Sequence, residues 1–218
     1  MGKQGIIKYW GEYRSTFLFL VLMVVFRSSV ADWNEVPTGS MKPTIVEGDR
    51  IWVNKLAYDV KLPLANISIY QIGLPKRGEI IVFNSNNADK RLIKRVIGLP
   101  DDIVSMKNNQ LYINDKLLKY DLVDKSTQLL RFNENLLGVN HLMQVNSQSP
   151  SPRSSFTPVK VPENQYLVLG DNRDNSADSR YIGFVPRDEI IGRATSVVIS
   201  LNYEKYYLPR AERFLIDL

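Results

Sequence analysis

The longest apolar stretch of the chain lies near its N-terminus, at residues 16–26 (TFLFLVLMVVF), after the basic residues Lys3, Lys8 and Arg14. As a helix this stretch would be about 16 Å long, shorter than the roughly 30 Å hydrocarbon core of a bilayer. A helix over residues 15–31 comes closer, because the side chain of Arg27 can extend to the headgroups. Basic residues before an apolar helix favour a cytoplasmic N-terminus. We therefore expect one transmembrane helix as a membrane anchor at residues 15–31, after a cytoplasmic N-terminus at residues 1–14.

Two other interpretations of this stretch stay open. The small residues at 29–31 (SVA) are spaced like the end of a cleaved signal peptide. A short apolar helix can also belong to a buried core. The anchor and the signal peptide both predict that residues 32–218 lie outside the cytoplasm.

The rest of the chain has the pattern of a β protein. Short runs of β-branched and aromatic residues are bounded by Gly, Asp and Asn, and few stretches have a helical period. These runs lie at residues 50–53, 78–83, 91–98, 102–105, 110–114, 165–169, 181–185, 189–194 and 196–201. They predict a mostly-β domain over residues 32–218. Residues 117–148 are the least patterned, and residues 146–158 (NSQSPSPRSSFTP) predict an exposed loop, so we expect a variable insert at about 115–160.

Composition removes several kinds of site. The 218 residues include no cysteine and one histidine, His141, which excludes disulfides, thiolate nucleophiles and sites with several histidines. Because His141 lies in the least patterned part of the chain, we interpret it as a solvated surface residue and not as a base. The net charge of +5 is small and forms no clustered stripe, so nucleic acid is not an expected partner. An anionic membrane surface suits this charge equally well.

A stiff turn holds one serine, Ser40, in residues 37–44 (PTGSMKPT). The two prolines restrict the backbone, and Gly39 allows another segment to approach closely. A plain Ser/Thr/Pro turn explains this pattern. The alternative is a nucleophilic serine whose own N–H, together with the hydroxyl of Thr38, stabilises an oxyanion.

Lys94 is the strongest candidate for a base. Strand alternation over residues 91–97 places Lys94 on one face with Leu92 and Val96, and the two arginines of this segment on the other. Apolar neighbours disfavour a charged amine and lower the pKa of a lysine. A neutral amine could accept the Ser40 proton. The same pattern also fits a lysine that extends from a half-buried strand into solvent.

The polar segment at residues 170–180 (GDNRDNSADSR) has three interpretations. Its carboxylates and amides resemble a metal loop, but the Gly and Glu spacing of an EF-hand is missing, so we expect no metal. It could be a structural turn with internal ion pairs. It could also support a Ser/Lys pair, with a hydroxyl that orients the amine and an Asp–Arg pair that holds the loop.

Together these segments resemble the type I signal peptidases, the membrane-anchored Ser/Lys endopeptidases of bacteria. Four blocks carry the resemblance, in the order found in that family and after an apolar N-terminal segment: PTGSMKPTI with DRIWVNKLAY, KRGEIIVF, RLIKRVIGLP and GDNRDNSADSRYIGFVPRDEIIGRA. The match covers about residues 36–194, with gaps in residues 117–158. The resemblance implies coiled antiparallel β-sheets of the signal-peptidase type, preceded by one N-terminal transmembrane helix.

The resemblance also assigns roles to residues, and it implies no cofactor. Ser40 would be the acylating nucleophile, Lys94 the general base and Thr38 an oxyanion-hole hydroxyl. Ser176 would orient the Lys94 amine, and Asp178 and Arg180 would form the supporting ion pair, with Asp171 and Arg173 shaping the same loop. The apolar pockets for small substrate side chains at positions −1 and −3 would be formed by Met41, Ile45, Ile51 and Ile93.

This chain departs from the family pattern at three places. One apolar segment precedes the serine, where many Gram-negative members have two. Asp101 stands where a glycine is common, and residues 33–35 (WNE) are less apolar than usual before the Pro-Thr-Gly-Ser turn.

The implied function is removal of N-terminal signal peptides from exported preproteins at an Ala-X-Ala site, through an acyl-enzyme. The implied location is the bacterial plasma membrane, as a single-pass protein in contact with lipids and with its catalytic domain on the extracytoplasmic, periplasmic side. Three alternatives are a specialised conjugation or pilus peptidase of the same family, a self-cleaving repressor-type Ser/Lys peptidase, and a tethered β domain that binds peptides without cleaving them. The apolar N-terminus and the lack of a helix-turn-helix segment count against the repressor type.

Overall fold

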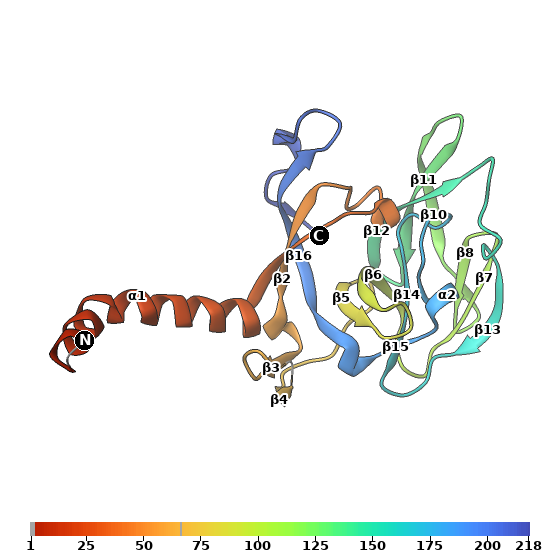
Figure 1. The fold of residues 1–218 in the computed structure, drawn as a ribbon. Helices are drawn as coiled ribbons and strands as arrows, with labels where there is room; N and C mark the ends of the chain where they lie inside the picture. The colour runs from red at the N-terminus through yellow and green to blue at the C-terminus, as the bar shows by residue number, and fades with distance from the viewer. Residues whose placement is uncertain (1–2, 66) are drawn as a thin grey trace.

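A computed structural model describes the backbone of residues 3–65 and 67–218, and the side chains of this part from residue 13 onward. A long N-terminal helix projects from a body made almost entirely of β-strands (Figure 1). The helices are α1 (Lys3–Ser29) and α2 (Ser179–Ile182). The strands are β1 (Ala31–Glu35), β2 (Asp49–Asn54), β3 (Asp59–Lys61), β4 (Ser68–Gln71), β5 (Ile80–Ser85), β6 (Lys90–Gly98), β7 (Ile103–Lys107), β8 (Gln110–Ile113), β9 (Lys116–Leu117), β10 (Lys119–Lys125), β11 (Leu129–Leu136), β12 (Val139–Asn146), β13 (Phe156–Lys160), β14 (Gln165–Leu169), β15 (Val185–Pro186), β16 (Ile190–Asn202), β17 (Leu208–Pro209) and β18 (Ile216–Asp217).

The apolar run at residues 16–26 is helical and its side chains are exposed, among them Phe19 and Leu22 at 63% and 57%. The prediction of a buried core helix is therefore wrong. The predicted transmembrane helix at residues 15–31 is also not found: no helix in the described part of the chain is long and apolar enough to cross a membrane. Its uninterrupted apolar stretch is short, and Arg14 and Arg27 flank it. Met1, Gly2 and the side chains of residues 3–12, which make up most of the predicted cytoplasmic segment 1–14, lie outside the described part.

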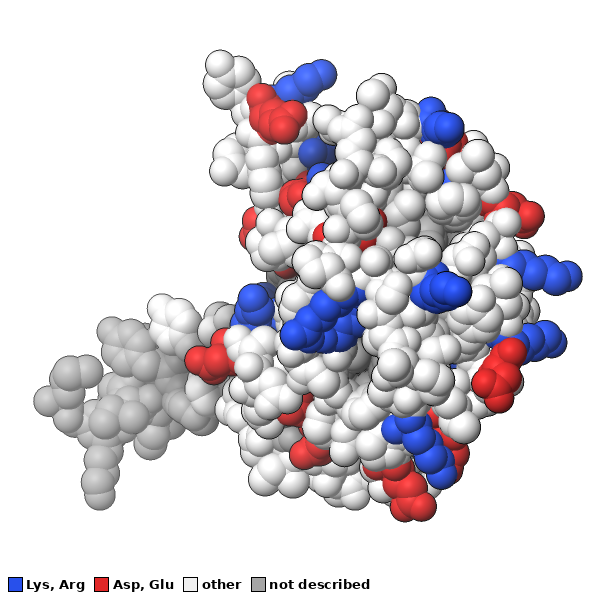
Figure 2. All heavy atoms as spheres, turned by 90° about the vertical axis from the view of Figure 1, so that its right-hand side faces the viewer, with Lys and Arg blue, Asp and Glu red and all other residues white. Residues whose placement is uncertain are grey.

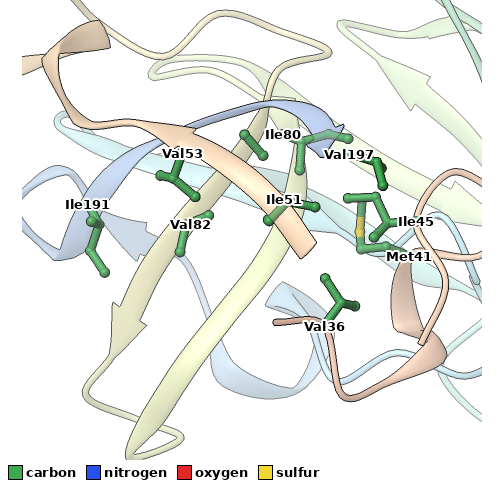
Figure 3. Close-up of a cluster of buried hydrophobic side chains, with 10 residues drawn as sticks. Val36, Met41, Ile45, Ile51, Val53, Ile80, Val82, Ile191 and Val197 are labelled. Atoms are coloured by element: carbon green, nitrogen blue, oxygen red, sulfur yellow. The ribbon is translucent and has the colours of Figure 1, made fainter. Parts of the chain in front are cut away.

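The principal sheet is antiparallel, with strand order β1-β2-β16-β5-β6-β14-β15. It confirms the prediction of a mostly-β domain. The apolar faces of β2, β5 and β16 enclose one core cluster, which also takes Met41 and Ile45 from the turn after β1 (Figure 3). The two strands expected at 189–194 and 196–201 are one continuous strand, β16. The strand expected at 181–185 begins as the helical turn α2, because the side chain of Asp178 caps the turn by accepting a hydrogen bond from the Arg180 N–H.

The least patterned region of the sequence is ordered as strands. Within residues 115–160, β10, β11 and β12 form a three-stranded antiparallel sheet, and β13 pairs with β7 in a second small sheet. The exposed loop predicted at 146–158 is found only in part: residues 147–150 are exposed, but Ser151 is buried and residues 156–158 belong to β13, which pairs with β7. Asp101, where the family commonly has glycine, has a φ of 70°, so the aspartate occupies the left-handed conformation that glycine adopts most easily. Figure 2 shows acidic and basic side chains interspersed over the face on the right of Figure 1.

A buried charge cluster joins the three-stranded sheet to the segment 170–180. The fully buried Glu134 of β11 accepts two hydrogen bonds from the guanidinium of Arg173, one of them 2.9 Å long. His141 Nε2 lies 2.9 Å from the same carboxylate, and its Nδ1 lies 3.5 Å from Asp171. The interpretation of His141 as a solvated surface residue is therefore wrong. Its strand, β12, carries it inward, where two carboxylates compensate for the loss of water.

We expect Glu134→Ala to lower the free energy of unfolding by about 3–5 kcal/mol, because it leaves the buried Arg173 guanidinium without its counter-ion. Urea denaturation of the full chain measures this loss. The matched control is Asp124→Ala. Asp124 lies on the edge strand β10 of the same sheet and forms an exposed ion pair with Arg131 of β11, so its loss should lower the free energy of unfolding by less than about 1 kcal/mol. Equal losses in the two variants would contradict this account of the cluster.

Candidate active site

Ser40 sits in a short 3-10 helix, Gly39–Met41, that directly follows the extended Thr38. The segment 170–180 packs against this turn. The backbone N–H of Asn172 donates to the carbonyl of Ser40 at 3.1 Å, and the Asn172 side chain donates to the carbonyl of Gly39 at 3.0 Å. A Cβ on Gly170 would lie 2.4 Å from the Ser40 carbonyl oxygen, so only glycine permits this approach. The backbone on both sides of Ser40 is therefore fixed by tertiary contacts.

The amine of Lys94 lies 2.7 Å from Ser40 Oγ and 2.9 Å from the carbonyl oxygen of Ile93. Lys94 is 2% exposed. Its cross-strand neighbour is Ile81, a residue of the cluster that also includes Leu92 and Val96, as strand alternation predicted. Burial lowers the pKa of Lys94 from 10.5 to about 8, against the opposing effect of the Asp178 and Asp171 charges. The amine is thus largely neutral in mildly alkaline solution and close enough to accept the serine proton.

Two buried ion pairs hold the segment 170–180 beside this amine. Asp178 binds both the Nε and an Nη of Arg180 at 2.8 Å and accepts a 3.0 Å hydrogen bond from the Gly170 N–H. Asp171 binds Arg95, the strand neighbour of Lys94, through two hydrogen bonds of 2.8 and 2.7 Å. Burial by itself would raise the pKa of Asp171, but the Arg95 guanidinium holds that pKa below its ordinary value. Asp171 therefore favours its charged form, directly next to Asn172, whose backbone and side chain bind the Ser40 turn.

Two of the predicted hydroxyl groups are near Ser40 but lack the expected bonds. Ser176 Oγ lies 2.3 Å from the point that a Cβ on Gly170 would occupy, next to the Ser40 carbonyl. It is buried and has no hydrogen-bond partner among the described residues, whereas a bond to the Lys94 amine was expected. Thr38 is exposed, and its side chain does not cap the 3-10 helix. Of the two, Thr38 lines the groove beside Ser40 and Ser176 does not.

A groove runs away from Ser40 along two sheet edges. Its lining is Asn34, Glu35, Val36, Pro37, Thr38, Gly39, Ser40, Met41, Lys90, Arg91, Leu92, Ile93, Lys94, Asn175 and Ala177. One wall continues from β1, which pairs only with β2. The other wall is the first half of β6, because the pairing of β6 with β14 begins only at Arg95. The groove is thus an open seam in the coiled sheet.

The four residues expected in the substrate pockets divide into two groups. Met41 and Ile93 line the groove. Ile45 and Ile51 do not: both are completely buried in the core cluster behind it (Figure 3). A sequence pattern marks all four as apolar and inward-facing, but it does not distinguish the groove wall from the core beneath it.

Several site residues were not singled out from the sequence. Asn172, which binds both carbonyls of the Ser40 turn, lies in a noted segment without an assigned role; Arg91 begins the block RLIKRVIGLP and Asn34 lies in WNE, but neither was given a role. In the part of the chain that the structure describes, no three His, Asp or Glu side chains are grouped as metal ligands.

Comparison with known proteins shows the family of the chain. The sequence model of the family "signal peptidase, peptidase S26" matches residues 8–199. The chain is 35% identical to signal peptidase I of Pseudomonas aeruginosa over 218 residues, covering 92% of this chain and 75% of that protein. It is 36% identical to the probable signal peptidase I-2 of a Synechocystis strain, covering 85% and 71%. The solved signal peptidase I of Enterococcus faecalis V583 matches 57% of this chain and 99% of its own, with 32% identity and a TM-score of 0.38. From the family model and the two sequence relatives, which match most of its length, the chain belongs to the signal peptidase family, peptidase S26, and is a serine peptidase.

Proposed function

We propose that this peptidase removes N-terminal signal peptides from exported preproteins, cutting after a small-X-small site such as Ala-X-Ala, with Ser40 and Lys94 as a catalytic dyad. The observation that carries the proposal is the 2.7 Å contact between the Ser40 hydroxyl and a buried amine of lowered pKa. The only histidine, His141, is held by Glu134 in another cluster, so a Ser-His pair at Ser40 has no support.

The reaction would begin when Ser40 Oγ attacks the carbonyl carbon of the scissile peptide bond and its proton passes to the neutral Lys94 amine. The Ser40 N–H and the Thr38 hydroxyl would stabilise the oxyanion. Lys94 would then give the proton to the leaving amine, which frees the mature N-terminus and leaves an ester on Ser40. Neutral Lys94 would next take a proton from water, whose oxygen attacks the ester; the bond from the acyl carbon to Ser40 Oγ then breaks, Lys94 returns the proton to that oxygen, and the signal peptide leaves with a free carboxylate.

The two unpaired sheet edges beside the groove support binding of the substrate as an extended strand. Backbone groups on the edges of β1 and of residues 90–94 that no neighbouring strand pairs can bind the substrate backbone. Met41 and Ile93 would contact the small side chains at positions −1 and −3. Ser176 would donate to or accept from the Lys94 amine once a substrate is bound, and the Asp178–Arg180 pair would keep the loop in place.

Contact with membrane lipids is part of this proposal, and with it a catalytic body on the extracytoplasmic side of the bacterial plasma membrane. The apolar side chains of α1 are exposed over several turns, and a contiguous exposed apolar surface marks a membrane or protein interaction site. Lipid contact near the groove would bring the enzyme to membrane-bound preproteins.

Replacement of the base should stop cleavage. We expect Lys94→Ala to lower kcat by at least about 1,000-fold, since among the described side chains no other amine is bonded to Ser40 Oγ. The assay incubates the full chain in detergent with a preprotein that has an Ala-X-Ala site and measures product masses. Lys119→Ala, an exposed lysine of β10, should cleave like the wild type, after the last Ala. Turnover by Lys94→Ala at the wild-type rate would exclude the dyad, and no cleavage by the wild type would exclude the proposed function.

Activity should depend on pH through the Lys94 amine. Below its pKa of about 8 the amine is protonated and cannot accept the serine proton, so kcat should fall about tenfold for each pH unit below that value. Above it kcat should reach a plateau. Single-turnover rates between mildly acidic and alkaline pH test this, and a rate that does not change below neutrality would contradict a titrating lysine.

Lipid binding should require the apolar face of α1. Phe19, Leu22 and Phe26 are spaced on one side of the helix, and all three are exposed. Changing all three to Ser should weaken binding to phosphatidylglycerol-containing vesicles at least about tenfold, because it removes apolar area that the lipid would cover. Vesicle flotation measures this, with Leu122→Ser and Val123→Ser on the exposed strand β10 as the control. Equal flotation of the two variants would contradict lipid contact through α1.

A further inference from the structure

At the end of the groove away from Ser40, one side chain bridges the two walls. Arg91 of β6 donates from Nη1 to the Asn34 side-chain oxygen of β1 at 2.9 Å, and from Nε to the side-chain oxygen of Asn84 at 3.2 Å. Both Arg91 and Asn34 line the groove. β1 and the first half of β6 are the two unpaired edges beside the groove. The hydrogen bond between Arg91 and Asn34 therefore connects the two walls.

The positive charge at this end of the groove has no counter-ion. Both acceptors of Arg91 are neutral amides, and no carboxylate among the described residues forms an ion pair with Arg91 or with the adjacent lining residue Lys90. Glu35, the acidic residue of the lining, is instead directed to Arg50 and the hydroxyl of Tyr203. This end of the groove is therefore basic.

Asn34 also has unused hydrogen-bonding capacity. Its side-chain nitrogen is buried and has no partner among the described residues. A buried donor without an acceptor is unfavourable, and a ligand that supplies an oxygen relieves this cost. Arg91 lines the groove with its guanidinium bound only to neutral amides, and the unpartnered amide nitrogen of Asn34 belongs to a residue of the same lining, so a chain that brings an oxygen acceptor here would be bound best.

Strand geometry gives the position of this acceptor along the substrate. Arg91 and Ile93 are two residues apart on one face of β6, about 7 Å along the strand, and Arg91 is the farther from Ser40. On the proposed function, Ile93 contacts the side chain at −3, which precedes the scissile bond. A substrate strand in the groove therefore places its residue near −5 opposite Arg91.

We infer that Arg91, Asn34 and Lys90 form a specificity subsite that favours an acidic or amide side chain near position −5 of the preprotein and disfavours a basic one. The inference rests on the proposed function, because the substrate and its direction come from it. Substrate binding exchanges the bond between Arg91 and Asn34 for bonds to the substrate oxygen. The selectivity is electrostatic, so it weakens as salt is added.

The test compares three peptides with one Ala-X-Ala site that differ only at −5, where they have Glu, Gln or Lys. For the wild-type full chain we expect kcat/KM to decrease from Glu to Gln to Lys, with Glu about fivefold to tenfold above Lys, the size expected for exposed charge pairs. Arg91→Glu should reverse the order. Asn34→Asp keeps Arg91 but gives it a counter-ion, and it should remove most of the preference. Lys119→Glu makes the same kind of charge change on β10, away from the groove, and should keep the wild-type order.

The outcomes separate the inference from the proposed function. If the wild type cleaves all three peptides after the last Ala with equal kcat/KM, or if Arg91→Glu keeps the wild-type order, the peptidase proposal stands and the subsite is wrong. The subsite is also wrong if the peptides show a charge preference only at −4 or −6 and Arg91→Glu leaves that preference unchanged. If the wild type cleaves none of the peptides, both proposals fail.

Discussion

A lysine amine held almost free of water, 2.7 Å from a serine hydroxyl, is the contact on which the site depends. Burial disfavours the charged form of Lys94, and the pKa falls to about 8 even though two carboxylates nearby oppose the change. The protein must therefore keep Asp171 and Asp178 from moving closer to the amine. Each carboxylate is bound to an arginine by two hydrogen bonds, and the positive charge of that arginine partly offsets the effect of the carboxylate on the pKa of Lys94.

The segment that contains these carboxylates is held in place from two directions. On one side, Asn172 and Gly170 fit tightly against the Ser40 turn. On the other, Arg173 reaches Glu134 of the β10–β12 sheet, and the backbone of β12 bonds to the segment at Asp171 and Arg173. The sheet that the sequence presents as an insert thus connects, through a completely buried ion pair, to the backbone of Ser40. Glu134 and Arg173 stabilise each other, because both are completely buried and water solvates neither charge.

The groove follows from how the principal sheet ends. β14 pairs with β6 only from Arg95 onward, and β1 has a partner on one side only, so two edges face each other next to Ser40. Unpaired edges attract extended chains. The edges can bind the backbone of any extended chain. The groove between them is lined by the apolar Met41 and Ile93 near Ser40 and by the basic Arg91 at its other end, so it can also distinguish between substrate side chains.

The sequence by itself determined the β class, the alternation that buries Lys94, and, through four motif blocks, the family and the set of residues around Ser40. These properties are local: strand period, turn residues and short motifs are written in consecutive positions. Tertiary structure alone decided which inward-facing residues line the groove, since Ile45 and Ile51 have the same pattern as Met41 and Ile93 but lie behind it. It also brought His141 to a buried carboxylate and Arg91 to Asn34. The reason is physical: such contacts join residues far apart in the chain, and their energy depends on burial and distance, which no single stretch of sequence specifies.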